Sequence, residues 1–419
     1  AAALRRATVS IEYRHAREHE LAEFEYADLV GFAGSTAEAT VQRNLERSVV
    51  RAEWKLGAFE DGRLVAQAAA FPFVMRWGGR EIGCSGVTGV STLPSHRRRG
   101  HVRELIRRLL AEAHEAGQPV AMLWASMAAI YQRFGYGVAC TCLSYEFDPA
   151  LLRFVDPIEA PGRVRLLKAT EAVPLMADAY ERFAAGRTLT LRRDTPALGD
   201  WWHNFVLRHW MPDVPWLIAV YEEAGEPLGY VIYFVQQRPE QASRTNQLVL
   251  AKELVWLTPA AHRALVGMLA SYDLAGAVRI QWQPADDPLF LHAQEPRWLN
   301  ARALDGTLLR IVDVQTALEQ RGYPVDGRFS FAVADELCPW NAGSWELCVE
   351  GGAAAVRRCA AEPQLSFDMR ALAMLASGHR PATELARAGM IRAAAPTALH
   401  VADALFRLSA APVCLDAVF

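Results

Sequence analysis

An arginine-rich turn between an apolar run and an amphipathic pattern is the strongest chemical feature of the sequence. The stretch 87–105 reads VTGVSTLPSHRRRGHVREL and predicts a strand, a tight turn and a helix. A helix N-terminus carries unpaired N–H groups and a partial positive charge, so it suits a pyrophosphate. Gly100 would let the backbone approach the phosphates, and Arg98, Arg99 and Arg103 would add charge-assisted hydrogen bonds. Local chemistry alone leaves a solvated basic helix start as the alternative.

Two motifs carry a resemblance to a known enzyme family. The RRxG pattern at this junction resembles the coenzyme A pyrophosphate loop of GNAT-superfamily N-acetyltransferases, although Val102 stands where that loop usually has Gly or Ala. The strings HRRRG at 96–100 and AIYQRFGYG at 129–137 together closely resemble the Eis (enhanced intracellular survival) acetyltransferases. This resemblance extends over nearly the whole chain. It implies a GNAT domain, a degenerate second GNAT domain and a domain like sterol carrier protein type 2.

The resemblance implies acetyl-CoA as co-substrate and assigns residues to it. One strand would run along the pantetheine arm, the turn would hold the pyrophosphate, and the end of the next strand would lie near the acetyl group. The cofactor-binding residues predicted in this way are Val90, Ser91, Thr92, Arg98, Arg99, Gly100, His101, Val102, Arg103, Ser126 and Met127. The family often has an acidic residue at the position of Met127.

By the same resemblance, the catalytic residues are Tyr131 and the C-terminal Phe419. Tyr131 matches the family's general acid, which hydrogen-bonds the departing sulfur as negative charge develops there. A phenol of pKa ~10 is a weak acid toward a thiolate whose thiol has a pKa of ~8.5, so hydrogen bonding would be most of its role. The free carboxylate of Phe419 would be the base, and Val418 replaces an acid that the family often has there. The alternatives are a structural aromatic residue, with Tyr136 as a nearby decoy, and a frayed terminus.

Carboxylates and aromatic side chains gather in the N-terminal region. They would suit a cationic amine through ion pairing and cation–π contact, and a solvated acidic helix face is the alternative. The residues concerned are Glu23, Glu25, Asp28, Glu38, Phe24, Tyr26, Phe32 and Phe71.

An internal repeat predicts the elements that position these residues. The hairpin-like segment 54–71 is echoed at 216–234, and the elements that follow keep the same order in both copies. In the first copy, 101–117 has the apolar spacing of an amphipathic helix. The second copy reads TPAAHRALVG from 258, without the arginine cluster and the turn glycine. We therefore expect one acetyl-CoA site per chain, with His262 and Arg263 as structural residues.

The expected fold class is α/β and α+β, with tandem GNAT domains, the second degenerate, followed by a sterol-carrier-protein-type-2-like α+β domain. The expected boundaries are 1–155, 156–305 and 306–419. In the third part, short strands are expected at 328–334, 345–349, 354–359 and 364–369, before two helical stretches.

Composition excludes several other classes of protein. With 52% apolar residues, 22% charged residues and a net charge of -3, the chain is typical of globular proteins and has no basic field for nucleic acid. Its apolar runs are shorter than the ~18–20 residues of a membrane span, and no signal-peptide pattern opens the chain. Seven cysteines lack zinc-site spacing and are interpreted as buried thiols of a reducing compartment. We expect a cytoplasmic protein without a metal or a membrane partner.

These observations predict an N-acetyltransferase that acetylates an amine of a small polycation, aminoglycoside-like or lysine-like, by direct attack. The alternatives are acetylation of protein lysines or N-termini, and a ligand- or lipid-binding protein with a residual acetyltransferase scaffold. The resemblance also implies a homo-oligomer, a hexamer, in which the third domain delivers the C-terminus to the active site.

Overall fold

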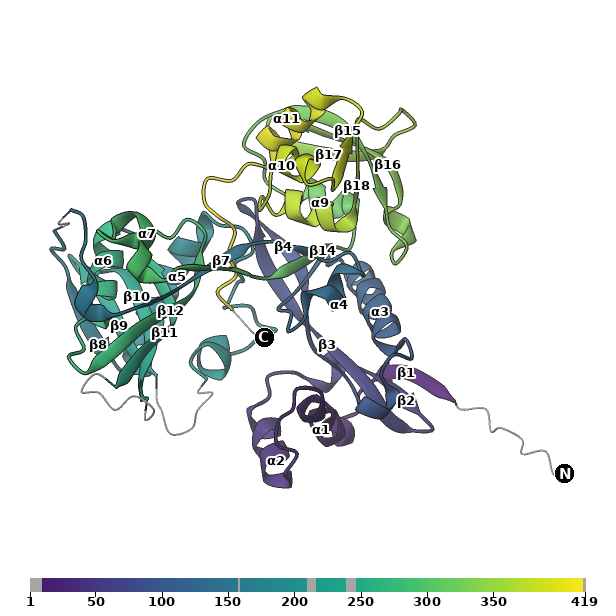
Figure 1. Ribbon diagram of the computed structural model, residues 1–419. Helices are drawn as coiled ribbons and strands as arrows, with labels where there is room; N and C mark the ends of the chain where they lie inside the picture. The colour runs from purple at the N-terminus through teal and green to yellow at the C-terminus, as the bar shows by residue number, and fades with distance from the viewer. Residues whose placement is uncertain (1–9, 157–158, 209–215, 239–245, 417–419) are drawn as a thin grey trace.

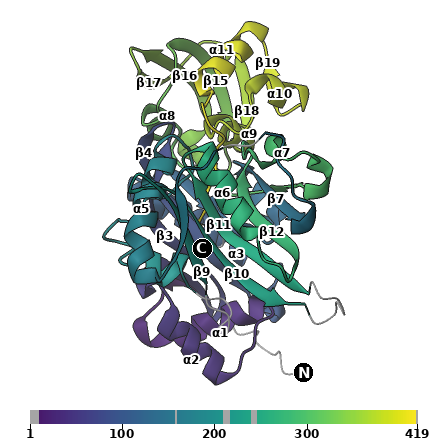
Figure 2. The same ribbon diagram turned by 90° about the vertical axis from the view of Figure 1, so that its left-hand side faces the viewer.

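The described residues form three β-sheets, two of seven strands and one of five (Figure 1). The computed structural model describes residues 10–156, 159–208, 216–238 and 246–416. Seen from the side in Figure 2, the second sheet lies in front of the first, and the third sheet lies beyond one end of both. We refer to the three sheets and their helices as the first, second and third domains.

The first domain is built around a long antiparallel hairpin of β3 and β4. Gly78 and Gly79, both with positive φ, form the turn between these strands. In sheet order the strands are β1 (Ile11–His15), β2 (Lys55–Glu60), β3 (Arg63–Trp77), β4 (Arg80–Thr92), β5 (Val120–Leu123), β14 (Leu308–Ile311) and β6 (Gly137–Val138). The helices are α1 (Leu21–Gly31), α2 (Glu38–Arg47), α3 (His101–Glu115) and α4 (Ala128–Gln132). The predicted amphipathic helix is confirmed as α3, whose buried leucines pack on β2, β3 and β4.

A fork opens in the first sheet between β4 and β5. These strands pair in parallel only from Cys84 to Gly86 on β4, which continues to Thr92 although β5 ends at Leu123. Opposite β3, β4 carries one extra residue near Gly89, whose φ is +56°. Such a bulge bends a strand and turns its edge away from its neighbour. The end of β4 therefore leaves β5 at the side of the sheet that faces α1.

The second domain repeats the order of the first. A hairpin of β9 and β10, then β11, α6 and β12, follow one another as β2, β3, β4, α3 and β5 do, which confirms the predicted repeat. In sheet order the strands are β13 (Arg302–Asp305), β7 (Thr141–Phe147), β12 (Ala275–Pro284), β11 (Gln247–Trp256), β10 (Glu226–Gln237), β9 (Leu217–Glu223) and β8 (Arg163–Leu167). The helices are α5 (Ala169–Ala185), a short π-helix (Trp202–Val206), α6 (Pro259–Leu269) and α7 (Leu289–His292).

The chain crosses twice between these two sheets. Strand β7 directly follows the last strand of the first sheet but pairs with β12 and β13 in the second. Strand β14 follows the second domain and returns to pair with β5 and β6. The buried side chain of Leu308 then joins the core of the first domain, and that of Leu309 joins a larger core that contains residues of all three domains. These crossings tie the two domains together through backbone hydrogen bonds.

The third domain is an α+β unit with helices at one side of its sheet. The predicted strands are confirmed within one or two residues, and β15 and β18 form the parallel pair. In sheet order the strands are β17 (Ala353–Arg358), β16 (Gly343–Glu350), β15 (Gly327–Ala334), β18 (Leu365–Asp368) and β19 (Ile391–Ala393). The helices are α8 (Val314–Glu319), α9 (Met369–Ala376), α10 (Ala382–Arg387) and α11 (Pro396–Phe406). After α11 the chain, yellow in Figure 1, leaves this domain and runs down between the other two.

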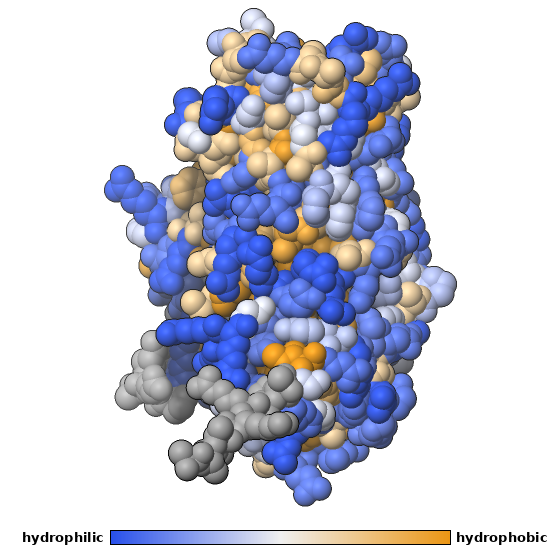
Figure 3. All heavy atoms as spheres, turned by 90° about the vertical axis from the view of Figure 1, so that its right-hand side faces the viewer, coloured by the Kyte–Doolittle hydropathy of each residue, from blue (hydrophilic) through white to orange (hydrophobic). Residues whose placement is uncertain are grey.

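The molecular surface agrees with the composition. The face on the side of α3 is mostly hydrophilic, and its hydrophobic residues form small separate areas (Figure 3). Within the described ranges, no helix combines the length and the apolar character that a membrane crossing requires.

Candidate active site

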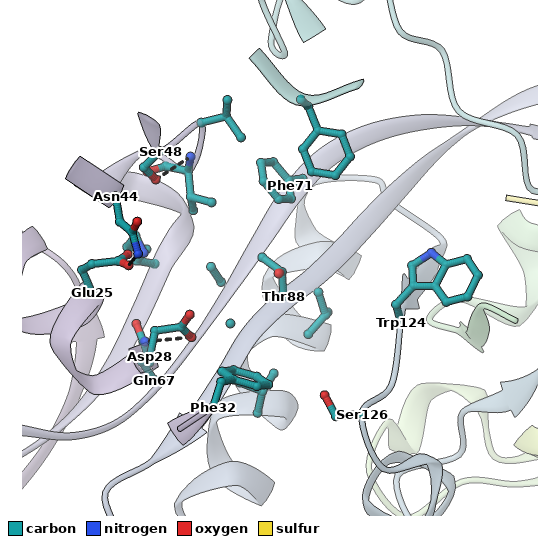
Figure 4. A pocket seen from close by; sticks show the side chains of 18 of the residues that line it. Glu25, Asp28, Phe32, Asn44, Ser48, Gln67, Phe71, Thr88, Trp124 and Ser126 are labelled. Atoms are coloured by element: carbon teal, nitrogen blue, oxygen red, sulfur yellow. Dashed lines mark hydrogen bonds between the residues drawn. The ribbon is translucent and has the colours of Figure 1, made fainter. Parts of the chain in front are cut away.

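A cavity of about 380 Å³ lies where the fork of the first sheet faces α1 and the second domain. Figure 4 shows carboxylates and amides from the first domain on one side, Thr88 in the middle, and Trp124 and Ser126 on the opposite side. The lining residues are Glu25, Asp28, Phe32, Asn44, Ser48, Val49, Val50, Lys55, Gln67, Ala69, Phe71, Val87, Thr88, Gly89, Val90, Trp124, Ser126, Tyr131, Phe205 and Arg208. Both ends of the fork, β4 and the segment after β5, therefore open into one space.

Tyr131 brings a protonated phenol to this cavity. It lies in the short helix α4, which follows the segment after β5. The ring of Tyr131 meets the ring of Tyr136 edge-on, with 6.0 Å between the ring centroids. Burial raises the pKa of Tyr131 to about 12, so the hydroxyl keeps its proton at neutral pH and donates. Tyr136 is fully buried in the core and does not line the cavity. The two tyrosines of the motif are thus separated by position, and only Tyr131 faces the open space.

The structure places the predicted strand residues unevenly around the cavity. Val90 and Ser126 line it, whereas Met127 does not. Met127 is the N-cap residue of α4, and it is 62% exposed to solvent. Ser91 is buried under α1, and a Cβ on Gly31 would come within 2.6 Å of the Ser91 Cβ. The close approach of α1 to the end of β4 therefore depends on Gly31.

The N-terminus of α3 has the open form that an anion site needs. Its N-cap is Gly100, with a φ of +90°, and no side chain caps the first turn. Arg98 and Arg103 are exposed and have no ion pair within the described part of the chain. The side chain of Arg99 is engaged, since it pairs with Glu60 at 3.3 Å and donates to the Ser95 carbonyl at 3.1 Å.

The side chains of His101 and Val102 pack against the protein and do not face the open N-terminus of α3. His101 is buried, its Nδ1 is hydrogen-bonded to the Tyr13 hydroxyl at 3.0 Å, and burial lowers the pKa of its imidazole. Val102 packs against the core of the first domain. Among the predicted phosphate ligands, these two residues have only their backbone N–H groups to offer.

The acidic side of the cavity contains half of the predicted amine-binding set. Glu25 accepts from the Asn44 amide at 2.7 Å, and Asp28 accepts from the Gln67 amide at 3.4 Å. Burial raises the pKa of Asp28 to about 6, with Lys55 opposing and Glu25 adding to the shift. Phe32 and Phe71 complete this part of the wall.

The other four predicted amine ligands lie elsewhere. Glu23 accepts from the Leu64 backbone N–H at 2.8 Å, and Phe24 is fully buried in a small core with Phe59. Tyr26 is 46% exposed, and Glu38 lies in the exposed first turn of α2. None of these four lines the cavity.

Several cavity residues have no signal in the sequence. Lys55 is a buried cation whose pKa burial lowers, and it lies next to Asp28 and Glu25. Trp124 follows β5, where no motif marks it, and its ring meets Trp282 edge-on at 4.9 Å. Phe205 and Arg208 come from the second domain, about 80 residues after Trp124 in the sequence, so only the fold brings them here.

Phe419 and Val418 lie outside the described residues. The last described residue, Asp416, has its side chain buried in the second domain, where it accepts from Arg193 at 3.0 Å and from Trp201 at 2.9 Å. The chain is therefore fixed close to its C-terminal end.

The second copy of the helix start is closed. Thr258 caps α6 by accepting from the Ala261 N–H at 3.1 Å, and Pro259 takes the first position. His262 is fully buried and pairs with Asp287 at 3.2 Å, while Arg263 donates to the Asp156 carbonyl. These contacts agree with the structural roles predicted for both residues.

Comparison with known proteins identifies the class. Residues 12–139 and residues 190–311 each match an acetyltransferase (GNAT) domain family, and residues 314–415 match a sterol carrier protein domain family. These matches define a GNAT N-acetyltransferase. The fork between β4 and β5, the Gly100 N-cap of α3 and the position of Tyr131 in the cavity agree with this class.

Full-length relatives then identify the family. An uncharacterized N-acetyltransferase of Streptomyces avermitilis is 31% identical over 395 residues, which cover 92% of this chain and 95% of the relative. N-acetyltransferase Eis of Mycobacterium tuberculosis is 29% identical over 406 residues, 92% of each chain. The crystal structure of Eis1 from Mycobacterium abscessus has a TM-score of 0.80 at 30% identity and covers 96% of this chain and 99% of its own. The chain belongs to the Eis family of GNAT N-acetyltransferases, as its motifs predict.

Proposed function

We propose that this N-acetyltransferase uses acetyl-CoA to acetylate an amine of a small polycation, aminoglycoside-like or lysine-like, in the cavity between the first and second domains. The observation that carries the proposal is the convergence of Tyr131, the open end of β4 and the carboxylates of Glu25 and Asp28 on one space. A thioester laid along β4 would bring its acetyl carbon between a hydrogen-bond donor and an acidic wall that attracts ammonium groups.

The donor side follows the fork. The free edge of β4 at Val90 to Thr92 would hydrogen-bond the amides of the pantetheine arm, since β5 no longer pairs there. The pyrophosphate would then meet the first-turn N–H groups of α3 and the exposed guanidinium groups of Arg98 and Arg103. Arg99 would join them on leaving Glu60, a surface pair of low cost to break.

The reaction itself is a direct displacement. The acceptor attacks the thioester carbonyl carbon as the neutral amine, and the nitrogen gives up a proton to a base as the C–S bond breaks and coenzyme A leaves as the thiolate. Tyr131 donates a hydrogen bond to that sulfur as its charge develops. With a pKa of about 12, the phenol stays protonated opposite a thiolate whose thiol has a pKa of ~8.5, so it stabilises charge without giving up its proton.

The proton of the acceptor requires a base, which we propose to be the terminal carboxylate of Phe419. A solvated terminus of pKa ~3.3 is a weak base, so it must lie in a low-dielectric position. The hexamer and the cytoplasmic location stay predictions of the resemblance and of the composition.

The experiment is the release of coenzyme A thiol from acetyl-CoA with an aminoglycoside, spermidine and a lysine peptide. It is run on this chain and on a chain extended by two residues after Phe419. We expect turnover that is highest with a polycation and is lost on extension. Turnover unchanged by extension would contradict the terminal base, and absence of turnover with all three amines would contradict the proposed acceptor class.

A further inference from the structure

The tail that follows α11 is bonded to the second domain at successive points. The Ala411 N–H donates to Asp286 at 3.0 Å, and Arg187 donates to the Ala411 carbonyl at 3.0 Å. The Val413 N–H donates to the Thr188 carbonyl at 3.0 Å, and Val413 and Cys414 are fully buried. The tail therefore docks along the segment 187–193 as an ordered part of the second domain.

The tail ends in a buried ionic cluster, which we call the tail clamp and define as Arg193, Trp201, Glu253 and Asp416. Arg193 binds Glu253 with two hydrogen bonds of 3.0 and 2.7 Å and donates to Asp416 at 3.0 Å through Nε. Trp201 donates its indole N–H to the same Asp416 oxygen at 2.9 Å. All four side chains are almost completely buried.

A buried cluster of this kind is a poor means of gaining stability alone. Removing three charges from water costs much of what their attraction returns, and apolar residues of similar volume are often as stabilising. What such a cluster provides is a fixed geometry, because the loss of a contact leaves a buried charge with fewer hydrogen bonds in a place that water does not reach. The position of Asp416 and the orientation of the Trp201 ring are therefore set together.

Trp201 transmits this geometry to the cavity. Its ring stacks on Phe205 at 4.2 Å and meets Phe71 edge-on at 5.6 Å, and both of these residues line the cavity. Trp201 itself lies behind them and does not line the space. Strand β11 supports the same wall, since Lys252, next to Glu253, donates to the Val206 carbonyl of the π-helix at 2.6 Å.

We propose that Asp416 and Trp201 are positioning residues for Phe71 and Phe205, which form the side of the cavity where the acceptor amine would bind. The tail of the third domain would then help to shape the active site of the first domain. The inference rests on the proposed function in that it takes this cavity as the acceptor site. It does not depend on the terminal base, because the path from Asp416 to Phe71 and Phe205 runs through side chains within the described part of the chain. It also gives the second domain, without a helix start open to phosphate, a role in the reaction.

The test uses the full chain and two conservative variants. Trp201→Phe removes the indole N–H that donates to Asp416, together with the five-membered part of the ring, and Asp416→Asn removes the charge at nearly constant shape. Trp345→Phe and Asp287→Asn are matched controls: Trp345 donates to the Asn341 carbonyl at 2.9 Å in the third domain, and Asp287 is a buried partner of His262. Neither control residue lines the cavity.

With spermidine as acceptor, we expect both clamp variants to raise the KM for spermidine about tenfold and to leave the KM for acetyl-CoA within about twofold. The controls should leave both constants unchanged at a comparable loss of Tm. The KM for spermidine in the double variant should rise by less than the product of the two single effects, because Trp201 and Asp416 share one hydrogen bond.

Hydrogen exchange separates failure of the clamp from failure of the proposed function. The backbone amides of 201–208 should exchange faster in both clamp variants than in the controls, whether or not spermidine is a substrate. Clamp variants that match the controls both in exchange at 201–208 and in spermidine kinetics would overturn the proposal. If Asp416→Asn does not fold, Trp201→Phe decides by comparison with Trp345→Phe, which loses the same part of its ring and the same N–H donor.

Discussion

The first two domains share one arrangement of strands and differ at the start of the helix that follows the hairpin and its next strand. In both, a hairpin leads to a strand, a helix and a parallel strand, and in both the first strand of the parallel pair continues beyond the pairing. Only the first domain begins its helix with a glycine of φ +90° beside unpaired arginines, whereas Thr258 and Pro259 close the start of α6. The fork is thus a property of the shared topology, and the anion cradle is a property of a few residues that one copy has and the other lacks.

The second domain contributes to the site in another way. It supplies Phe205 and Arg208 to the cavity wall, and it holds the tail of the third domain through Arg193. One copy therefore retains the donor chemistry, and the other supports the acceptor side. The comparison predicts where substitutions affect donor binding, acceptor binding or neither.

The largest expected effect is at Tyr131. Tyr131→Phe should lower kcat by about 100-fold or more, because a donor aimed at developing charge is removed, and should hardly change the KM for acetyl-CoA. Tyr136→Phe is the matched control, since it removes the hydroxyl of a fully buried neighbour, and its kcat should stay within about twofold. Steady-state thiol release measures both. Equal losses in the two variants would show that the motif contributes packing and not a hydrogen-bond donor.

The next effect contrasts one glycine in each copy. Gly100→Ala should weaken coenzyme A binding about tenfold. A residue with a Cβ disfavours this positive φ by about 1–2 kcal/mol, and the turn must adopt this conformation to bind the pyrophosphate. Gly267→Ala lies inside α6, where no atom is within 4 Å of the added methyl group, and should leave coenzyme A binding unchanged while raising Tm slightly. Calorimetry and thermal unfolding measure the two outcomes. Unimpaired binding by Gly100→Ala would argue against α3 as the phosphate site.

A smaller effect concerns the acidic wall and pH. The pKa of Asp28 is about 6, so its carboxylate is charged above this pH and becomes neutral below it. The KM for a cationic acceptor should therefore rise by up to about tenfold from pH 7 to pH 5, over which an aliphatic ammonium group does not titrate. Asp28→Asn should have, at both pH values, the high KM that the wild type reaches at pH 5, and its KM should no longer depend on pH. A wild-type KM that is flat over this range would separate Asp28 from acceptor binding.

The features of the molecule that the sequence could predict are local. The strand, turn and helix around Gly100 follow from residue type and spacing, and so does the loss of the cradle in the second copy. The exchange of β7 and β14 between sheets leaves no local signature, since each strand is compatible with either sheet. The same holds for Lys55, a cation inside an acidic wall, and for Phe205 and Arg208. The contact of Arg193 with Asp416 joins residues 223 positions apart, where neither periodicity nor a motif connects them.

The chain contains two copies of the fold, and we expect it to bind the acetyl donor at the first domain alone. The deciding measurement is isothermal titration of the full chain with coenzyme A, repeated on the Gly100→Ala variant. We predict one molecule bound per chain and a binding constant weakened in the variant. Two molecules per chain, or one whose affinity Gly100→Ala leaves intact, would contradict the claim.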